Sequence, residues 1–182
     1  MQYQHGLVEV LEKQKLNVIC FFTNGMPNTQ MSMPSIPEVV QRFLCKQGLP
    51  MIDALINVMK VSLTSSGALD VGYLKEWNVP LLQAYTIIAP YEEWKDSFEG
   101  MNAMEISISV SLPEFDGIVH GVPIACKKVL PNGDVRYLPI ADRVELMARK
   151  AAKWARLRHK ANAEKKIAII FHNYPPRNSN IG

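Results

Sequence analysis

The amino-acid sequence predicts an α/β protein with three layers: a mainly parallel β-sheet flanked by helices, with an inserted β-hairpin. Three observations predict this fold. Short apolar runs of strand composition alternate along the chain with segments of helical periodicity. An Asn132-Gly133 pair lies between apolar residues and is typical of a hairpin turn. The 182 residues are 48% hydrophobic and 20% charged, which is the composition of one globular core.

The first half of the chain alternates between helix and strand patterns. Strand composition occurs in three apolar runs, at residues 16–22, 51–59 and 79–84. A short amphipathic segment around residues 7–11 precedes the first run. Ser35 and Glu38 have the spacing of a capping box, which predicts a helix start with a buried stripe of Val39, Val40, Phe43 and Leu44. Ser65 and Ser66 are expected to cap the next helix, which contains Leu69, Tyr73, Leu74 and Trp77.

The second half repeats the alternation. Pro90 is expected to open a short helix that Gly100 closes. Between residues 106 and 112, Ile, Val and Leu alternate with Ser, which predicts a strand with one buried face. The hairpin, inserted at about residues 118–138, is followed by the longest predicted helix, residues 139–160, and by a closing strand at 167–171.

The order of elements also predicts where a ligand would bind. Parallel sheets bind ligands beyond the carboxyl ends of their strands. Five segments are expected to converge there: residues 23–34, 60–65, 85–89, 113–117 and the stretch from 172 onward. The closing strand leads into a loop with no helix after it, although such a strand normally continues into a covering helix. We therefore expect residues 1–182 to be a single α/β domain that is a fragment of a longer protein.

Composition excludes several classes of protein. Three widely spaced cysteines do not make a disulfide framework or a zinc site, and they indicate a cytoplasmic protein. No apolar run reaches the roughly 18–20 residues of a membrane span. Nine of the twenty basic residues lie between Arg143 and Lys166, but we interpret them as a solvated face because aromatic residues are not interleaved among them in the way that a base-stacking surface requires. The chain also lacks a P-loop motif, so an ATP-driven process would need a partner.

Two segments carry candidate functional residues. Glu114, Asp116 and His120 are close in sequence, and such side chains can accept protons or bind a divalent ion. The alternative interpretation is a turn in which Asp116-Gly117 supplies the backbone geometry and Glu114 is solvated. His172 and Arg177 lie in the loop after the closing strand, where a metal or an anionic ligand could be held, or prolines could simply stiffen a connection.

Several stretches of the sequence together resemble one known family. The stretch from Arg143 to Arg158, the following Ala163–Ile170, and the His172-Asn173-Tyr174-Pro175-Pro176-Arg177 motif are similar to the large subunit of cobalt and magnesium chelatases. Shorter similar pieces occur at residues 53–57, 79–84, 93–97 and 112–117. The resemblance covers about residues 50–182. The form of the His172–Arg177 motif looks more like the cobaltochelatase (CobN-like) branch than the magnesium branch.

The resemblance implies a function in cobalamin biosynthesis. In that family the large subunit binds the tetrapyrrole and the metal, and separate AAA-type subunits hydrolyse ATP. The implied partners are therefore the remainder of the large subunit, the ATPase subunits and the tetrapyrrole, without nucleic acid. Cobalt or magnesium and ATP would belong to the full complex, and no cofactor is expected on the fragment alone, which would be inactive as a chelatase.

Metal insertion requires bases that remove two pyrrole protons. The candidates are Glu114, Asp116 and His172 as catalytic groups, Asn173 and Arg177 for substrate binding, and His120 and His172 for the metal. The alternatives are a domain of a magnesium-chelatase large subunit and a non-catalytic scaffold or docking module.

Overall fold

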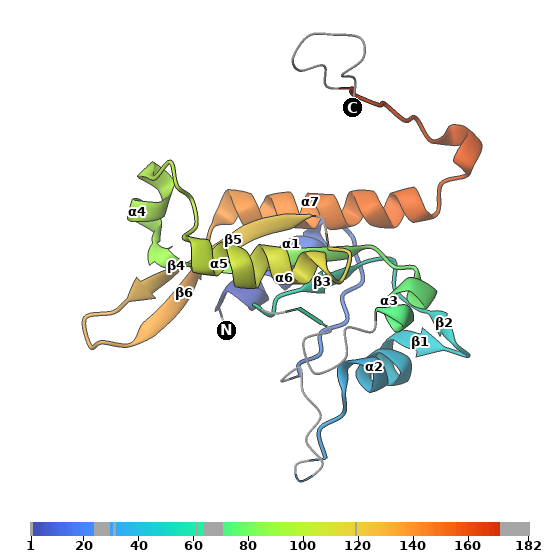
Figure 1. The fold of residues 1–182 in the computed structure, drawn as a ribbon, viewed down its shortest axis with the longest axis horizontal. Coiled ribbons are helices and arrows are strands. Elements are labelled where there is room, and N and C mark those ends of the chain that lie inside the picture. The colour runs from blue at the N-terminus through green and yellow to red at the C-terminus, as the bar shows by residue number, and fades with distance from the viewer. Residues whose placement is uncertain are drawn as a thin grey trace.

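The structure is a computed structural model of the chain, and it describes residues 2–23, 30, 32–60, 62–63, 71–118 and 120–171. The predicted caps Ser65 and Ser66, the predicted core residue Leu69, and the loop from His172 to Arg177 lie outside the described residues. The elements, in order, are α1 Gln2–Lys13, α2 Ile36–Val39, the π-helix η1 Val40–Leu44, β1 Cys45–Lys46, β2 Leu49–Pro50, β3 Leu55–Asn57, α3 Gly72–Trp77, β4 Leu81–Pro90, α4 Tyr91–Asp96, α5 Ala103–Ile106, the π-helix η2 Ser107–Ser111, α6 Leu112–Glu114, β5 Gly121–Val129, β6 Val135–Pro139, α7 Ala141–Arg158 and the 3₁₀-helix η3 Asn162–Glu164 (Figure 1).

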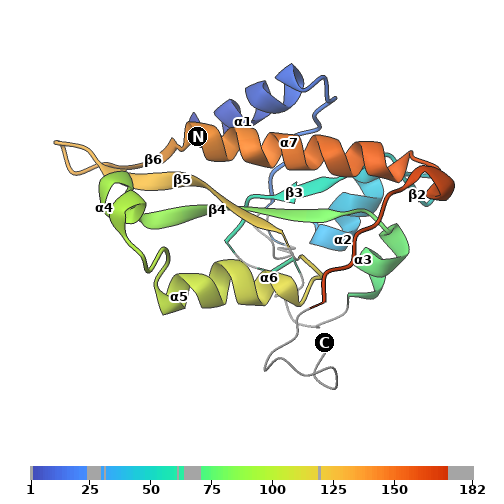
Figure 2. The same ribbon diagram turned by 90° about the horizontal axis from the view of Figure 1, so that it is seen from above.

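A mixed four-stranded sheet forms the middle layer, in the order β3-β4-β5-β6. Strands β3, β4 and β5 are parallel, and β6 pairs with β5 in antiparallel register, with Val129 opposite Val135. Figure 2 shows α1 and α7 on one face of the sheet and α5 to α6 on the other. The predicted three-layer α/β architecture and the hairpin at Asn132-Gly133 are therefore confirmed, and both strands of that hairpin, β5 and β6, belong to the main sheet.

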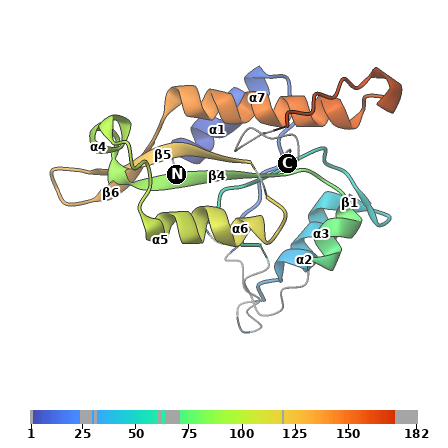
Figure 3. The ribbon, with the colours of Figure 1, turned by 45° about the horizontal axis from the view of Figure 1, so that its top comes forward.

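The largest core lies between the sheet and the two helices α1 and α7. Leu82 and Ile124 from the strands and Met147 from α7 have no exposed surface. Full burial of each such side chain contributes about 1.5–3 kcal/mol to folding. A second cluster packs α2 and α3 against one end of the sheet, around Leu55 and Trp77 (Figure 3). The chain thus closes both faces of its sheet with helices.

The helix starts that were predicted from capping signals are confirmed at two places. Ser35 and Glu38 form the capping box at α2, with the Ser35 amide donating to the Glu38 carboxylate at 2.6 Å. Helix α4 begins directly after Pro90, but it ends at Asp96, before Gly100. Phe43 was expected in a buried stripe, and this was wrong because its side chain is 49% exposed.

The strand predicted at residues 106–112 is wrong. This stretch is helical and runs continuously through α5, η2 and α6. The helix begins at a second capping box, in which the Glu105 amide donates to the Asn102 side chain at 2.9 Å. Alternating Ile and Ser fit a strand, but this cap fixes the helical start.

Two other predicted strands are not formed. Residues 16–22 and 167–171 are extended without a strand partner in the described part of the chain. Leu16 and Val18 still pack against the main core beside β3. Figure 1 shows residues 165–171 leaving the end of α7 away from the sheet. Both segments therefore have the composition of strands, but neither pairs with a strand among the described residues.

One of the cysteines provides a test of the core. Cys126 on β5 is 2% exposed, and burial, followed by the nearby charge of Glu105, raises the pKa of its thiol to about 11. The thiolate is the reactive form, so we expect a maleimide at pH 8 to label the exposed Cys20 rapidly and Cys126 only after unfolding. Mass spectrometry of the labelled peptides measures both rates, and equal labelling of the two thiols would contradict the burial of Cys126.

The sign of the pH effect follows from the same shift. The folded-state pKa lies above the ordinary value of 9.0, so ionisation of Cys126 favours the unfolded chain. Its contribution to stability is fully present below pH 9 and is lost as the pH rises to about 11. The variant Cys126→Ala should lack this part of the alkaline pH dependence.

Candidate functional site

The candidate site is a cavity of about 510 Å³ beside the amino ends of β4 and β5. Its apolar wall comes from the end of α3 and the entry into β4, and consists of Leu74, Val79, Pro80 and Leu81. Two aromatic rings, Phe115 and Trp154, complete this wall. A mostly apolar cavity with a few polar groups is the usual form of a site for an organic ligand.

The polar groups of the cavity include two residues that the sequence singled out. Asp116 and His120 both line it, together with Lys75 and Asn78. The two are brought together by the turn that connects α6 to β5. His120 directly precedes β5, and its carbonyl accepts a hydrogen bond from the Gln83 amide of β4 at 2.9 Å. The backbone position of His120 is therefore fixed by the sheet.

The imidazole of His120 lies beside the indole of Trp154 on α7. The two ring centroids are 5.6 Å apart, and the rings are tilted by 50°. Close packing after His120 is provided by Gly121, since a Cβ there would lie only 2.8 Å from Cε1 of Tyr85. The contact between His120 and Trp154 was not predicted, because residues 34 positions apart on different elements share no local sequence signal.

Asp116 holds two loops together. Its side chain is 5% exposed, with Oδ1 accepting from the Ser62 hydroxyl at 2.7 Å and Oδ2 accepting from the Leu63 amide at 2.6 Å. Hydrogen bonds to a carboxylate are stronger than neutral ones. The turn before β5 is thereby tied to the loop after β3, and Gly117, with φ +83°, supplies the left-handed turn geometry.

A buried network of side-chain amides fixes the start of the loop after β3. Asn57 donates to the Gln83 side chain at 2.9 Å, and Gln83 in turn donates to the Met59 carbonyl at 2.6 Å. The Met59 amide donates back to Asn57 Oδ1 at 3.0 Å. Asn57 and Gln83 are 4% and 2% exposed, and buried amides are stable only when they are hydrogen-bonded in this way. The backbone from Asn57 to Met59 is therefore held in place at the start of this loop.

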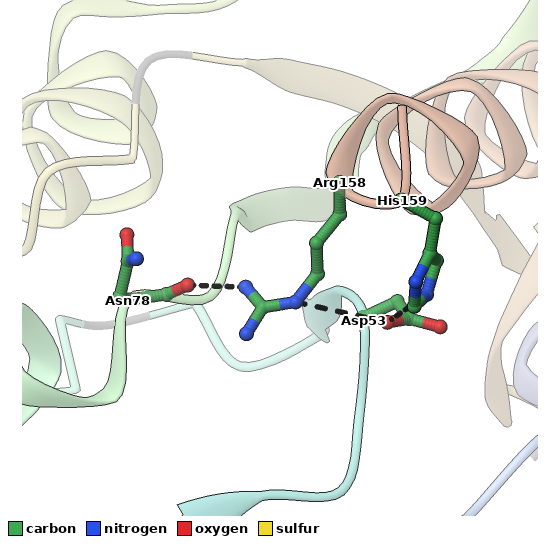
Figure 4. A network of polar contacts seen from close by, with 4 residues as sticks. All are labelled: Asp53, Asn78, Arg158 and His159. Carbon is green, nitrogen blue, oxygen red and sulfur yellow. Dashed lines mark hydrogen bonds and ion pairs between the residues drawn. The ribbon is translucent and has the colours of Figure 1, made fainter. Parts of the chain in front are cut away.

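A second network, at the end of α7, holds the helix that carries Trp154 (Figure 4). Arg158 donates to the Asn78 carbonyl and lies 3.7 Å from the Asp53 carboxylate. His159 contacts the same carboxylate oxygen at 2.7 Å. These contacts join α7 to the end of α3 and to the loop before β3. They sit one helical turn beyond Trp154 and so secure its position over His120.

The other predicted site residues are placed differently. Glu114 is exposed and does not line the cavity, and His172, Asn173 and Arg177 lie outside the described residues. Among the described residues, no three His, Cys, Asp or Glu side chains are grouped closely enough to hold a metal ion. The metal-binding role of His120 and His172 therefore stays a prediction.

The predicted convergence of loops is correct for one pair of segments. Residues 62–63 and 116 meet through the Asp116 hydrogen bonds. Residues 85–89, in contrast, are part of β4 and form no loop, because β4 continues to Pro90. Residues 113–117 precede β5 and do not follow a strand, because residues 106–112 are helical. The site therefore lies nearer the amino ends of β4 and β5 than the sequence indicated.

A second, smaller cavity of about 370 Å³ lies at the carboxyl end of β4, where ligands of parallel sheets usually bind. It is lined by Tyr91, Trp94 and Lys95 from α4 and by Arg143 from α7. The guanidinium of Arg143 lies 5.7 Å from the centre of the Trp94 ring. Glu114, Asp116 and His120, the predicted site residues that the structure describes, do not line this cavity, so we take the cavity at His120 as the candidate site.

Comparison with known proteins identifies the family. The family model described as CobN/Magnesium Chelatase matches residues 1–182. The chain belongs to this family. An uncharacterized protein of Methanocaldococcus jannaschii, MJ0908, is 36% identical over the whole chain, which corresponds to 15% of that relative. The aerobic cobaltochelatase subunit CobN of Pseudomonas aeruginosa is 34% identical over 58% of the chain and 9% of its own length.

The plant and structural relatives extend this comparison. The chloroplastic magnesium-chelatase subunit ChlH of Oryza sativa subsp. indica is 28% identical over 97% of the chain and 12% of its own length. The solved catalytic subunit of cobaltochelatase from Mycobacterium tuberculosis superposes with a TM-score of 0.67 at 23% identity, covering 94% of this chain and 14% of that one. The chain thus shares that fold, and its matches span 9–15% of the length of these relatives. None of its described helices is long and apolar enough to cross a membrane.

Proposed function

We propose that this chain is a domain of the large, tetrapyrrole- and metal-binding subunit of an ATP-dependent cobaltochelatase in cobalamin biosynthesis. The observation that carries the proposal is the cavity lined by Asp116 and by His120 with its ring beside Trp154, in a chain whose whole length matches the chelatase family. In this proposal residues 1–182 are one domain of a longer cytoplasmic subunit. ATP is hydrolysed on separate AAA-type subunits, which agrees with the absence of a P-loop motif in the sequence.

The cavity suits a flat macrocycle in two respects. The rings of Trp154 and Phe115 and the surrounding aliphatic side chains provide apolar contact area for a conjugated ring. The insertion of a divalent metal, which is a substrate here, releases two protons from pyrrole nitrogens, so a base must lie at the ring. The imidazole of His120, which lines the cavity beside Trp154, is the proton acceptor of the proposal.

Asp116 has a different role in this proposal. Its two carboxylate oxygens already accept hydrogen bonds from Ser62 and Leu63, so it positions the turn that presents His120. His172, Asn173 and Arg177 follow the extended segment at residues 165–171. We propose that His172 meets the metal or accepts the second proton, and that Asn173 and Arg177 bind polar substituents of the ring.

The cobalt type is preferred over the magnesium type because the CobN relative of P. aeruginosa has 34% identity, against 28% for the plant ChlH subunit. The ChlH match extends over more of the chain, and it supports the magnesium-chelatase alternative. A non-catalytic scaffold is the alternative that requires no ligand in the cavity. Ligand binding by the chain itself separates these three functions.

Calorimetric titration with a metal-free corrinoid and a metal-free porphyrin tests the proposal. We expect the corrinoid to bind with a Kd in the micromolar range and the porphyrin at least about tenfold more weakly. Trp154→Ala should weaken corrinoid binding about tenfold or more, because an aromatic contact and its buried area are lost. Trp94→Ala, in the second cavity, is the matched control and should bind normally.

Three results would contradict parts of the proposal. Stronger porphyrin binding would favour the magnesium type. If only Trp94→Ala lost binding, the ligand would bind in the cavity at Arg143 and not in the cavity at His120. The absence of binding to either ring would favour the scaffold.

A further inference from the structure

The helix formed by α5, η2 and α6, here called the α5–α6 helix (residues 103–114), has an inverted distribution of polarity. The side chains that face the sheet include Glu105 and Ser109, which are 6% and 3% exposed. The outward side carries large apolar side chains instead. Their exposed fractions are 72% for Met104, 43% for Ile106 and 38% for Leu112. A helix at the surface of a soluble protein normally shows the opposite arrangement.

The outer face of the α5–α6 helix also lacks charged side chains. From Met101 to Pro113 the only charged residue in the sequence is Glu105, and it is buried against the sheet. Helix α7, on the other face of the same sheet, serves as an internal comparison. Its exposed side presents Arg149, Lys153 and Arg156. Helix α7 therefore has an ordinary solvated face, whereas the outer face of the α5–α6 helix carries no charge.

The shape of this outer face indicates what covers it. Ala103, Ser107 and Ser111 are all exposed and are spaced four residues apart, so they form a line along the helix. Met104 and Leu112 lie on one side of this line, and Ile106 lies on the other. A line of small side chains between apolar ridges lets a second helix approach closely and pack its own ridge into the groove.

We propose that the outer face of the α5–α6 helix is buried in the assembled large subunit against an uncharged helix from the rest of that subunit. This inference rests on the proposed function, since it takes the chain to work within a chelatase large subunit. The matched region is 15% and 14% of two M. jannaschii relatives, so most of the length of such a subunit is outside it.

A second unpartnered segment supports a large neighbour. Ile167, Ile169 and Ile170 are 83%, 72% and 93% exposed. Figure 1 shows the segment that carries them lying away from the sheet, and Figure 2 shows it running from the end of α7 toward the side on which α6 lies. A neighbour that covers both this segment and the α5–α6 helix must be large, as the remainder of a large subunit is.

The test uses purified proteins without tetrapyrrole or metal. The binding partner is the M. jannaschii relative MJ0908 from which the segment matching this chain has been deleted, and binding is measured by interferometry. We expect the wild-type chain to bind and Ser107→Glu to bind about a hundredfold more weakly, because a carboxylate would be buried without a partner. Gln41→Glu, at an exposed position on η1, adds the same charge elsewhere and should bind like wild type.

Thermal unfolding of the three proteins serves as the folding control, and the midpoints should be equal because Ser107 and Gln41 are both exposed. Equal binding of Ser107→Glu and wild type would overturn the proposal, as would a wild-type chain that does not bind. If the wild-type chain instead forms a dimer that Ser107→Glu dissociates, the face belongs to a second copy, and the proposed occupant is wrong. Because no ring is present, failure of the corrinoid titration leaves this result unchanged.

Discussion

Replacing Asp116 with alanine should lower the free energy of unfolding by about 3 kcal/mol, since the Ser62 hydroxyl and the Leu63 amide would lose their buried acceptor. The cost arises mainly from the donors that are left unsatisfied. Asp116→Asn keeps one carbonyl acceptor and should be intermediate. Urea unfolding followed by circular dichroism measures all three free energies.

The neighbouring carboxylate provides the control for this experiment. Glu114 is exposed, so Glu114→Ala should change the unfolding free energy by no more than about 0.5 kcal/mol. If Asp116→Ala unfolded at the same urea concentration as wild type, the two hydrogen bonds could not be the contacts that hold the loop after β3. A large loss in Glu114→Ala would point to a contact of that side chain elsewhere.

The second large effect concerns the metal insertion that we propose for the assembled subunit. In the complete chelatase, His120→Gln should lower the insertion rate about a hundredfold, because a positioned base contributes about 10²–10⁴ to such a step. Glutamine keeps a polar side chain of similar length beside Trp154 but cannot take up a proton near neutral pH. The affinity for the metal-free ring should therefore stay within a few-fold of wild type, and the loss should appear in the rate constant.

A histidine far from the cavity supplies the comparison. His5 is on α1 and is paired with Glu9 at 3.2 Å, so His5→Gln should insert metal at the wild-type rate. An unchanged rate in His120→Gln would remove His120 from the reaction. A parallel loss of ring affinity and rate would instead make it a binding residue.

The elements that sequence reasoning predicted correctly are those with local signals. The Asn132-Gly133 turn and the long apolar stripe of α7 each depend on residues within a few positions of one another, and both are present. Residues 106–112 were misread because Ile and Ser at alternate positions satisfy the period of a strand as well as one flank of a helix. The decisive signal was Asn102 with Glu105, three residues apart, just before the apolar run.

The site was only partly predictable for a related reason. Asp116 and His120 are four residues apart, so their proximity was visible in the sequence. Trp154 and Ser62 reach them only through the packing of α7 and the path of the loop after β3, which no local pattern encodes. At residues 16–22 and 167–171 the local signal was present, because both segments have strand composition. They form no strand, because neither has a strand to pair with among the described residues.

The antiparallel return of β6 has a consequence for how this domain can vary. Because Pro139 pairs with Ala125 and the Ile140 amide donates to the Ile124 carbonyl, α7 begins at a point set by that register. Residues added to the turn at 130–134 would lengthen the tip of the hairpin and leave the helix where it is. One residue added between Pro139 and Trp154 would rotate every later position of α7 by about 100° and move Trp154 away from His120. The hairpin tip is thus free to change in length, whereas the spacing between Pro139 and Trp154 is fixed by the cavity.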